Sequence, residues 1–131
     1  MDRFMASALT HMLVVADVDA SRDWYVRVLD ADVHGEYGGT SVVLDVLGHW
    51  ILLVTGGGPD EGKPTVTLEP PTNPDRVSGQ LVFRVEDCEG LHRLLSDRGA
   101  DFLAPPHVRA GETRAFFRDP DGHLFEISEL T

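Results

Sequence analysis

The sequence contains one cysteine and no long apolar run. Cys88 cannot form an internal disulfide, and it has no spaced partner that would complete a structural zinc site. Apolar runs such as residues 12–16 have the length of a strand and fall far short of the roughly 20 residues that cross a bilayer. No basic region followed by an apolar core and a cleavage site marks an export signal. These absences predict a reduced, cytoplasmic protein without a membrane anchor.

Basic residues are also scarce. The 131 residues include 11 Lys and Arg against 22 Asp and Glu, so the formal net charge is −11. A nucleic-acid partner requires a basic surface, and an anionic membrane would repel this chain, so we expect neither as a partner. The charge would attract a cationic small molecule, although an acidic surface also serves solubility alone. With 42% hydrophobic and 25% charged residues, the composition is that of one globular domain over residues 1–131.

The chain contains an internal repeat, because three stretches of its first half resemble three of its second half. The matched stretches are 10–17 with 79–86 and 31–33 with 100–102, both 69 positions apart, and 48–50 with 122–124, 74 positions apart. Each copy begins with a strand that ends in an acidic residue. A segment rich in glycine and proline, residues 56–79, separates the copies and is expected to be a linker, with a short extended piece at 65–68.

Each copy is expected to form a strand, a helix and three further strands. Apolar spacing predicts helices over 20–29, capped by Asp19 or Ser21, and over 89–98, capped by Asp87 and ended by Gly99. The expected later strands are 33–37, 41–46 and 50–54 in the first copy, and 102–103, 113–118 and 124–128 in the second. The fold class is therefore α+β, with two tandem βαβββ modules at about 8–55 and 78–130. Their strands would form a curved mixed sheet around a cavity, with the helices outside.

Strand alternation assigns side chains to the cavity. In the second copy Leu81 and Phe83 should meet the helix, so Gln80 and Arg84 should face the cavity, as should Glu126. With the 69-residue offset, the repeat places His11 on the cavity face of the first copy. The cavity residues expected to bind substrate are Trp50, Leu52 and Arg84.

An imidazole, an amide oxygen and a carboxylate are ligands that a divalent cation accepts. We therefore expect His11, Gln80 and Glu126 to converge on one metal ion, within one chain or across a dimer, with Glu126 also serving as a catalytic base. The alternative for Glu126 is a pair with a proton-bearing side chain such as Arg84 or Arg114, because a carboxylate on an apolar strand needs a partner. The alternative for His11 is a strand histidine without a functional role.

Two phrases of the sequence resemble the vicinal oxygen chelate superfamily, which includes glyoxalase I, extradiol dioxygenases, fosfomycin-resistance transferases and bleomycin-resistance proteins. They are DVDASRDWY at 17–25 and FRDPDGHLFEI at 117–127, and the likeness covers about residues 8–130. The resemblance implies paired βαβββ modules around a metal site, with ligand positions at His11, Gln80 and Glu126. Leu52 falls on the fourth position, where glyoxalase-type enzymes have a glutamate. Gln80 stands where dioxygenase-like members have a histidine.

Two functions from different classes follow. In the first, the protein is a metal-dependent enzyme of the glyoxalase or dioxygenase type, in which Zn, Ni, Mn or Fe chelates vicinal oxygens of a substrate. In the second, it resembles the bleomycin-resistance proteins, which dispense with the metal and bind a cationic drug between two subunits. A homodimer is expected in either case, because two-fold symmetry would close the open sheet edges and the half-closed cavity.

Overall fold

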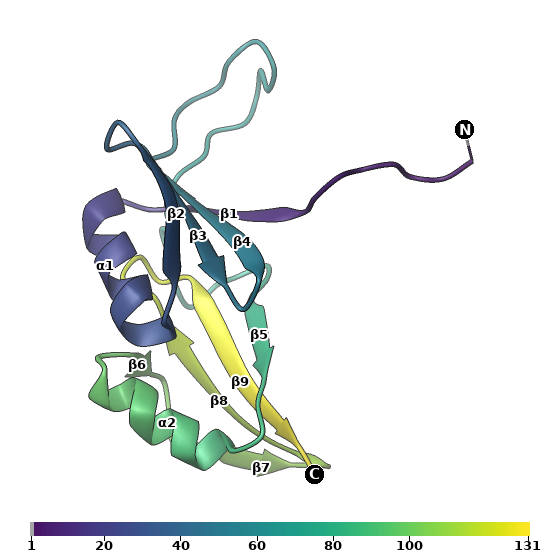
Figure 1. The fold of residues 1–131 in the computed structure, drawn as a ribbon, viewed down its shortest axis with the longest axis vertical. Coiled ribbons are helices and arrows are strands. Elements are labelled where there is room, and N and C mark those ends of the chain that lie inside the picture. The colour runs from purple at the N-terminus through teal and green to yellow at the C-terminus, as the bar shows by residue number, and fades with distance from the viewer. Residues whose placement is uncertain (1) are drawn as a thin grey trace.

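The computed structural model describes residues 2–131 and contains nine strands and two helices (Figure 1). The first module consists of β1 (Thr10–Val14), α1 (Val18–Leu29), β2 (Asp32–Tyr37), β3 (Ser41–Val46) and β4 (His49–Val54). The second consists of β5 (Leu81–Arg84), α2 (Cys88–Asp97), β6 (Asp101–Phe102), β7 (His107–Arg109), β8 (Glu112–Arg118) and β9 (Leu124–Leu130). Within this range no helix combines the length and apolar character that crossing a membrane requires.

The two sheets repeat one topology. The first has the strand order β1-β4-β3-β2 and the second β5-β9-β8-β6, with β7 paired to the start of β8 on the same edge as β6. The first and last strands of each module are parallel neighbours, and the other pairs are antiparallel. The α+β class and the two βαβββ modules are therefore confirmed. The short strand β7 was not expected, because its three exposed residues carry no alternating apolar signal.

Aspartates cap both helices. The Asp17 side chain accepts from the Ala20 amide at 3.1 Å and caps α1, which begins at Val18, two residues before the predicted start at residue 20. The predicted caps Asp19 and Ser21 therefore lie inside the helix. The Asp87 side chain accepts from Gly90 at 2.9 Å, as predicted. The predicted stop after α2 is also present, since Gly99 has a φ of 107°, which glycine adopts without strain.

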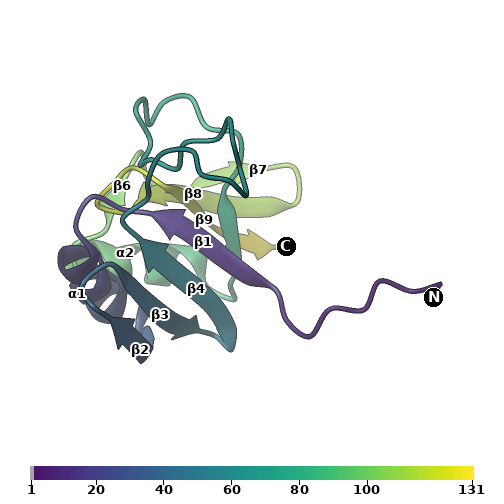
Figure 2. The same cartoon turned by 90° about the horizontal axis from the view of Figure 1, so that it is seen from above.

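The linker crosses the surface between β4 and β5 and folds back on itself. Leu68 forms an antiparallel bridge with Gly57, which agrees with the extended piece expected at 65–68. Residues 2–9 leave β1 as an extended arm that points away from the sheets (Figure 2).

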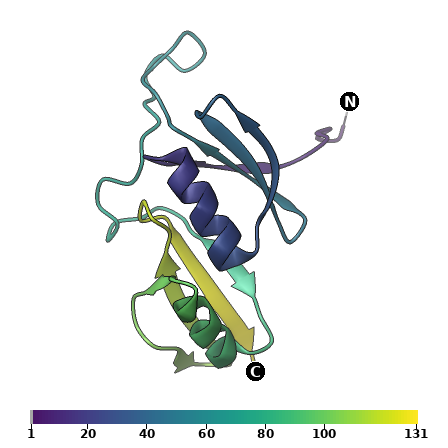
Figure 3. The same ribbon diagram turned by 60° about the vertical axis from the view of Figure 1, so that its left-hand side comes forward.

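The two modules share one hydrophobic core through α1. The rings of Trp24 and Tyr25 on α1 lie 6.4 and 6.0 Å from the ring of Phe125 on β9, and Trp24 is 6.3 Å from Phe117 on β8. Buried residues of both sheets belong to the same cluster. Figure 3 shows α1 running between the first sheet and β9. The helices were expected on the outside of one curved sheet, but in the described part of the chain the strands form two separate sheets, and α1 packs against both.

The turn between β8 and β9 fastens the second module to the first. Four hydrogen bonds join this turn to the first module: Tyr25 Oη to Asp119 Oδ2 at 2.6 Å, the Ala16 amide to Asp121 Oδ1 at 2.9 Å, Ser21 Oγ to Asp121 Oδ2 at 3.3 Å, and His123 Nε2 to the Val14 carbonyl at 2.7 Å. We call residues 119–123 the junction turn. Burial raises the pKa of Asp119 above its ordinary value, and burial together with that carboxylate raises the pKa of Tyr25 well above 10.

Alkaline pH is expected to destabilise the protein through Tyr25. Below pH 10 the folded and unfolded chains both keep this phenolic proton. Above pH 10 the unfolded chain releases it while the folded chain retains it, so the free energy of unfolding falls by up to about 1.4 kcal/mol per pH unit. Urea denaturation between pH 9 and 11 should show a steeper loss in the wild type than in Tyr25→Phe. Equal slopes would contradict the assignment.

Candidate functional site

Each sheet has one face on the shared core and one face turned away from it, which we call the open face. On β4, Ile51 and Leu53 are buried in the core, so Trp50 and Leu52 lie on the open face. Trp50 is 41% exposed. The two predicted substrate-binding residues of β4 are therefore on the same side of the sheet.

His11 lies on the opposite side of β1 from the predicted one. Leu13 and Val15 belong to the core, and alternation puts His11 on their face, in register with the buried Ile51. Thr10 is in register with Trp50 instead. His11 therefore lies on the core-facing side of β1 and not on the side of Trp50, where the repeat placed it, although it does line a pocket between the modules. The error comes from the 69-residue offset, because a one-residue slip moves every side chain of a strand to the other face.

The pairing of the strands gives the correct correspondence between modules. Met12 is in register with Leu52 across β1 and β4, just as Val82 is in register with Glu126 across β5 and β9. The two first strands are thus 70 positions apart, which makes Thr10 the counterpart of Gln80. The four equivalent open-face positions are Thr10, Leu52, Gln80 and Glu126.

Gln80 and Glu126 form a direct pair. The Gln80 amide Nε2 donates to Glu126 Oε1 at 3.0 Å, and Glu126 is only 6% exposed. Glu126 therefore accepts from a proton-bearing side chain, as the alternative held, but that side chain is the neutral Gln80 amide and not Arg84 or Arg114. His11 and Gln80 line the same pocket of about 310 Å³ at the junction of β1 and β5. The structure thus brings Gln80 to Glu126 directly and His11 near Gln80 from the core side.

The open-face positions do not fit a divalent cation. Only Glu126 supplies a charged ligand, Leu52 supplies none, and Thr10 offers a neutral hydroxyl. Gln80 turns its Nε2 toward Glu126, so the amide oxygen, which is the atom that a metal would bind, is not the atom beside that carboxylate. Across residues 2–131 no three His, Cys, Asp or Glu side chains are grouped closely enough to hold a metal ion. A glyoxalase-type ligand set would need at least three strong donors on this face.

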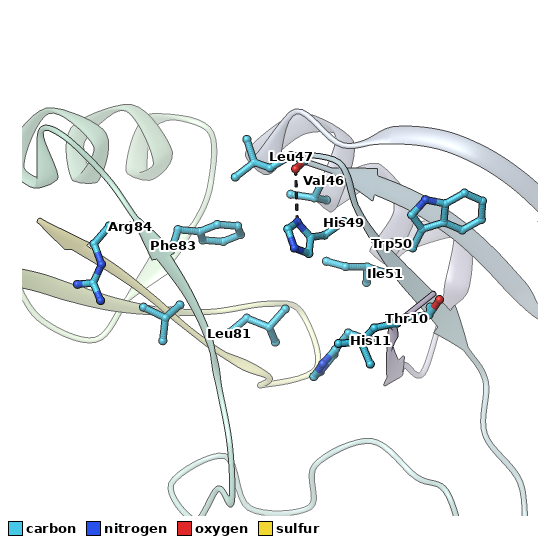
Figure 4. Close-up of a pocket in the computed structure, with 12 residues that line it drawn as sticks. Thr10, His11, Val46, Leu47, His49, Trp50, Ile51, Leu81, Phe83 and Arg84 are labelled. Atoms are coloured by element: carbon cyan, nitrogen blue, oxygen red, sulfur yellow. Dashed lines mark hydrogen bonds between the residues drawn. The ribbon is translucent and has the colours of Figure 1, made fainter. Parts of the chain in front are cut away.

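A pocket of about 400 Å³ lies between the modules (Figure 4). Figure 4 shows Leu81 and Phe83 of β5 on one side of it and His49 and Ile51 of β4 on the other. Trp50 and Arg84, two of the predicted substrate-binding residues, lie at opposite ends. The pocket is therefore apolar along its walls and has an indole at one end and a guanidinium at the other.

An arginine network that includes Arg84 lies on the open face of the second module. Arg84 Nη1 donates to Ser128 Oγ at 2.7 Å, and Ser128 Oγ donates to Glu112 Oε2 at 3.2 Å. Arg114 Nη1 donates to Glu112 Oε1 at 3.4 Å. Sequence reasoning considered Arg114 only as a partner for Glu126. The alternation of polar and apolar residues over 112–118 was the signal that could have placed it on this face.

Comparison with known proteins identifies the family. Residues 7–127 match the Glyoxalase/Bleomycin resistance protein/Dioxygenase superfamily. The chain belongs to this superfamily. The resemblance read from residues 17–25 and 117–127 is therefore confirmed, and the structure adds that the second phrase contains the junction turn.

Solved structures of this superfamily's fold resemble the whole chain. The VPC_CASS1 protein from the mobile metagenome of V. Pseudocholerae is 24% identical, with a TM-score of 0.73 and coverage of 100% of this chain and 99% of that one. FosX, a fosfomycin resistance protein from Listeria monocytogenes, is 20% identical, with a TM-score of 0.69 and coverage of 97% and 96%. A mutant of that FosX has been solved in complex with Mn(II) and 1S,2S-dihydroxypropylphosphonic acid. These likenesses show the fold.

A curated relative matches over a shorter stretch. The Uncharacterized protein YetH of Bacillus subtilis (strain 168) is 29% identical over 55 residues. The match spans 42% of this chain and 46% of YetH, so less than half of each protein is aligned.

Proposed function

We propose that this protein binds a small apolar molecule, without a metal ion, in the pocket between its modules. Two features together support this proposal. The pocket has apolar walls, and the four open-face positions do not provide enough ligands to hold a metal ion. Members of the superfamily with a complete set of ligands can polarise a substrate through a cation, whereas Leu52 and Thr10 leave this chain without that means. An apolar pocket with a few polar groups is the usual form of a small-molecule site.

Exposed aromatic residues extend the pocket over the first sheet. The ring of His34 lies 4.3 Å from that of Trp50, and the ring of Tyr37 lies over Gly35. Met12, Tyr37 and Trp50 are 45%, 57% and 41% exposed, whereas the residues of β3 and β4 on the other face, such as Leu44 and Leu53, are buried. Apolar side chains gathered on one surface favour a binding role over a purely structural one.

The proposal is tested with the neutral fluorescent probe N-phenyl-1-naphthylamine. The wild type should bind it equally in EDTA and in 1 mM added Zn, Ni, Mn or Fe(II). Trp50→Ala should weaken binding about tenfold or more, because burying an aromatic side chain contributes about 1.5–3 kcal/mol. Val108→Ala, which truncates an exposed residue on β7 away from the pocket, is the control and should bind like the wild type.

The same titration decides between the two functions. If a divalent metal binds better than millimolar, if Glu126→Ala removes that binding, and if EDTA abolishes probe binding, a metal-dependent enzyme that uses Glu126 as a ligand replaces the proposal. In that case the role of Glu126 as a base would be tested next. Absence of probe binding by the wild type would remove the binding function.

We also propose that the protein forms a homodimer. Strands β1 and β5 form outer edges of their sheets, and the aromatic face of the first module is uncovered within one chain. Both features favour association of two copies, which would cover edge and face together.

A further inference from the structure

If the pocket binds a small molecule as proposed above, the positive charge at its Arg84 end indicates the class of that molecule. We propose that the bound molecule is an amphipathic anion, whose carboxylate, sulfonate or similar oxyanion is received by Arg84 and Arg114. The net charge of −11 suggests a cationic ligand, but the charges at this end of the pocket have the opposite sign.

The guanidinium groups of Arg84 and Arg114 share the carboxylate of Glu112. Glu112 Oε1 accepts from Arg114 at 3.4 Å, and Glu112 Oε2 lies 3.8 Å from Arg84 Nη1. Glu126 is engaged by Gln80 and does not join the network. Arg84, Arg114 and Glu112 together sum to one positive charge, and the other charge on this face of β9 is the Glu126 carboxylate, two residues before Ser128. An added oxyanion would be the second acceptor that two arginines can hold.

Both arginines are held in place and yet reach solvent. Arg84 is anchored on the hydroxyl of Ser128, which is fully buried. The Arg114 guanidinium lies 5.4 Å from the centre of the Phe116 ring, which restricts its motion through a cation–π contact. Their side chains remain 56% and 29% exposed. Each guanidinium has five N–H groups, so donors remain free for a ligand.

The arginine cluster is continuous with the pocket. Arg84 lines the 400 Å³ pocket at the end opposite Trp50 (Figure 4), and Phe83 and Leu81 form the apolar wall beside it. A molecule whose apolar body lies along β5 would therefore place a terminal anionic group at Arg84. Arg114, on β8, does not line the pocket itself but is linked to Arg84 through Glu112, which both guanidinium groups approach.

Two fluorescent probes with nearly the same body test the inference. The anion 8-anilinonaphthalene-1-sulfonate differs from N-phenyl-1-naphthylamine by its sulfonate group. Arg84→Gln and Arg114→Gln should each weaken binding of the sulfonate about tenfold or more, because only the anion uses the charge-assisted contacts. Each variant should weaken the sulfonate several-fold more than the neutral probe, and Arg114→Gln, at a position that does not line the pocket, should leave binding of the neutral probe within about twofold. Sulfonate binding should also weaken as salt is raised from 50 to 500 mM.

Arg93→Gln provides the matched control. It makes the same change in net charge at an exposed position on α2 and should alter neither affinity. Circular dichroism melting checks that the variants are folded. If both arginine variants keep the wild-type affinity for the sulfonate while the neutral probe still binds, the inference is overturned and the proposed function stands. If the wild type binds neither probe, both fail.

Discussion

Replacing Phe125 by alanine should lower the free energy of unfolding by about 3–5 kcal/mol, the usual cost of truncating a fully buried aromatic residue. Phe125 stacks on Phe117 at 5.2 Å and on Phe83 at 6.0 Å, and it contacts Trp24 and Tyr25 of the other module. The cavity would therefore open at the point where α1 joins the two sheets. Urea denaturation followed by tryptophan fluorescence measures the change.

Phe116→Ala is the matched control for this prediction. Phe116 lies on β8 in register with Glu126, on the open face, and it is only partly buried. Its truncation removes less packing and should cost clearly less than that of Phe125. Both modules should lose their structure in one transition in every variant, since they share a core. Equal losses in Phe116→Ala and Phe125→Ala would contradict the assignment of the two faces.

Asp119→Ala is expected to have the second large effect, about 3–5 kcal/mol of unfolding free energy. The Asp119 side chain is buried and accepts three hydrogen bonds, from Tyr25 Oη at 2.6 Å and from the amides of Asp121 and His123 at 3.0 and 2.8 Å. Alanine would leave these donors without their acceptor at the junction of the modules. Buried donors without partners are among the costly defects of a folded chain.

Tyr25→Phe tests the hydrogen bond between α1 and Asp119 separately from the two hydrogen bonds that Asp119 accepts within its own turn. It removes only the donor on α1 and leaves the two amide bonds to Asp119 intact, so we expect a smaller loss of about 1–3 kcal/mol. Thermal melts of both variants and the wild type at pH 7 give the comparison. Asp119→Ala losing no more than Tyr25→Phe would show that the carboxylate does not organise the junction turn.

Much of the site could be read from the sequence where the signal was local. Gln80 and Glu126 follow from alternation within their own strands, and the structure pairs them at 3.0 Å. Asp87 was found as a cap from its place before an apolar helical pattern. Arg84 and Trp50 were both assigned to the cavity, and both line the pocket. The link between Arg84 and Arg114 could not be predicted from the sequence, because it runs through Glu112 and Ser128, which lie on different strands.

The face of β1 shows the limit of the sequence most directly. The repeat and the motifs alone determined the family and the two modules, since they depend on residue order and spacing. They could not decide between offsets of 69 and 70, because similar residues occupy both alignments. Only the tertiary structure decided this, by packing Leu13 and Val15 against the core and pairing Thr10 with Trp50. Because adjacent side chains of a strand point to opposite sides, this difference of one residue places His11 on the core side of β1. The open face therefore lacks the histidine that was expected as a metal ligand.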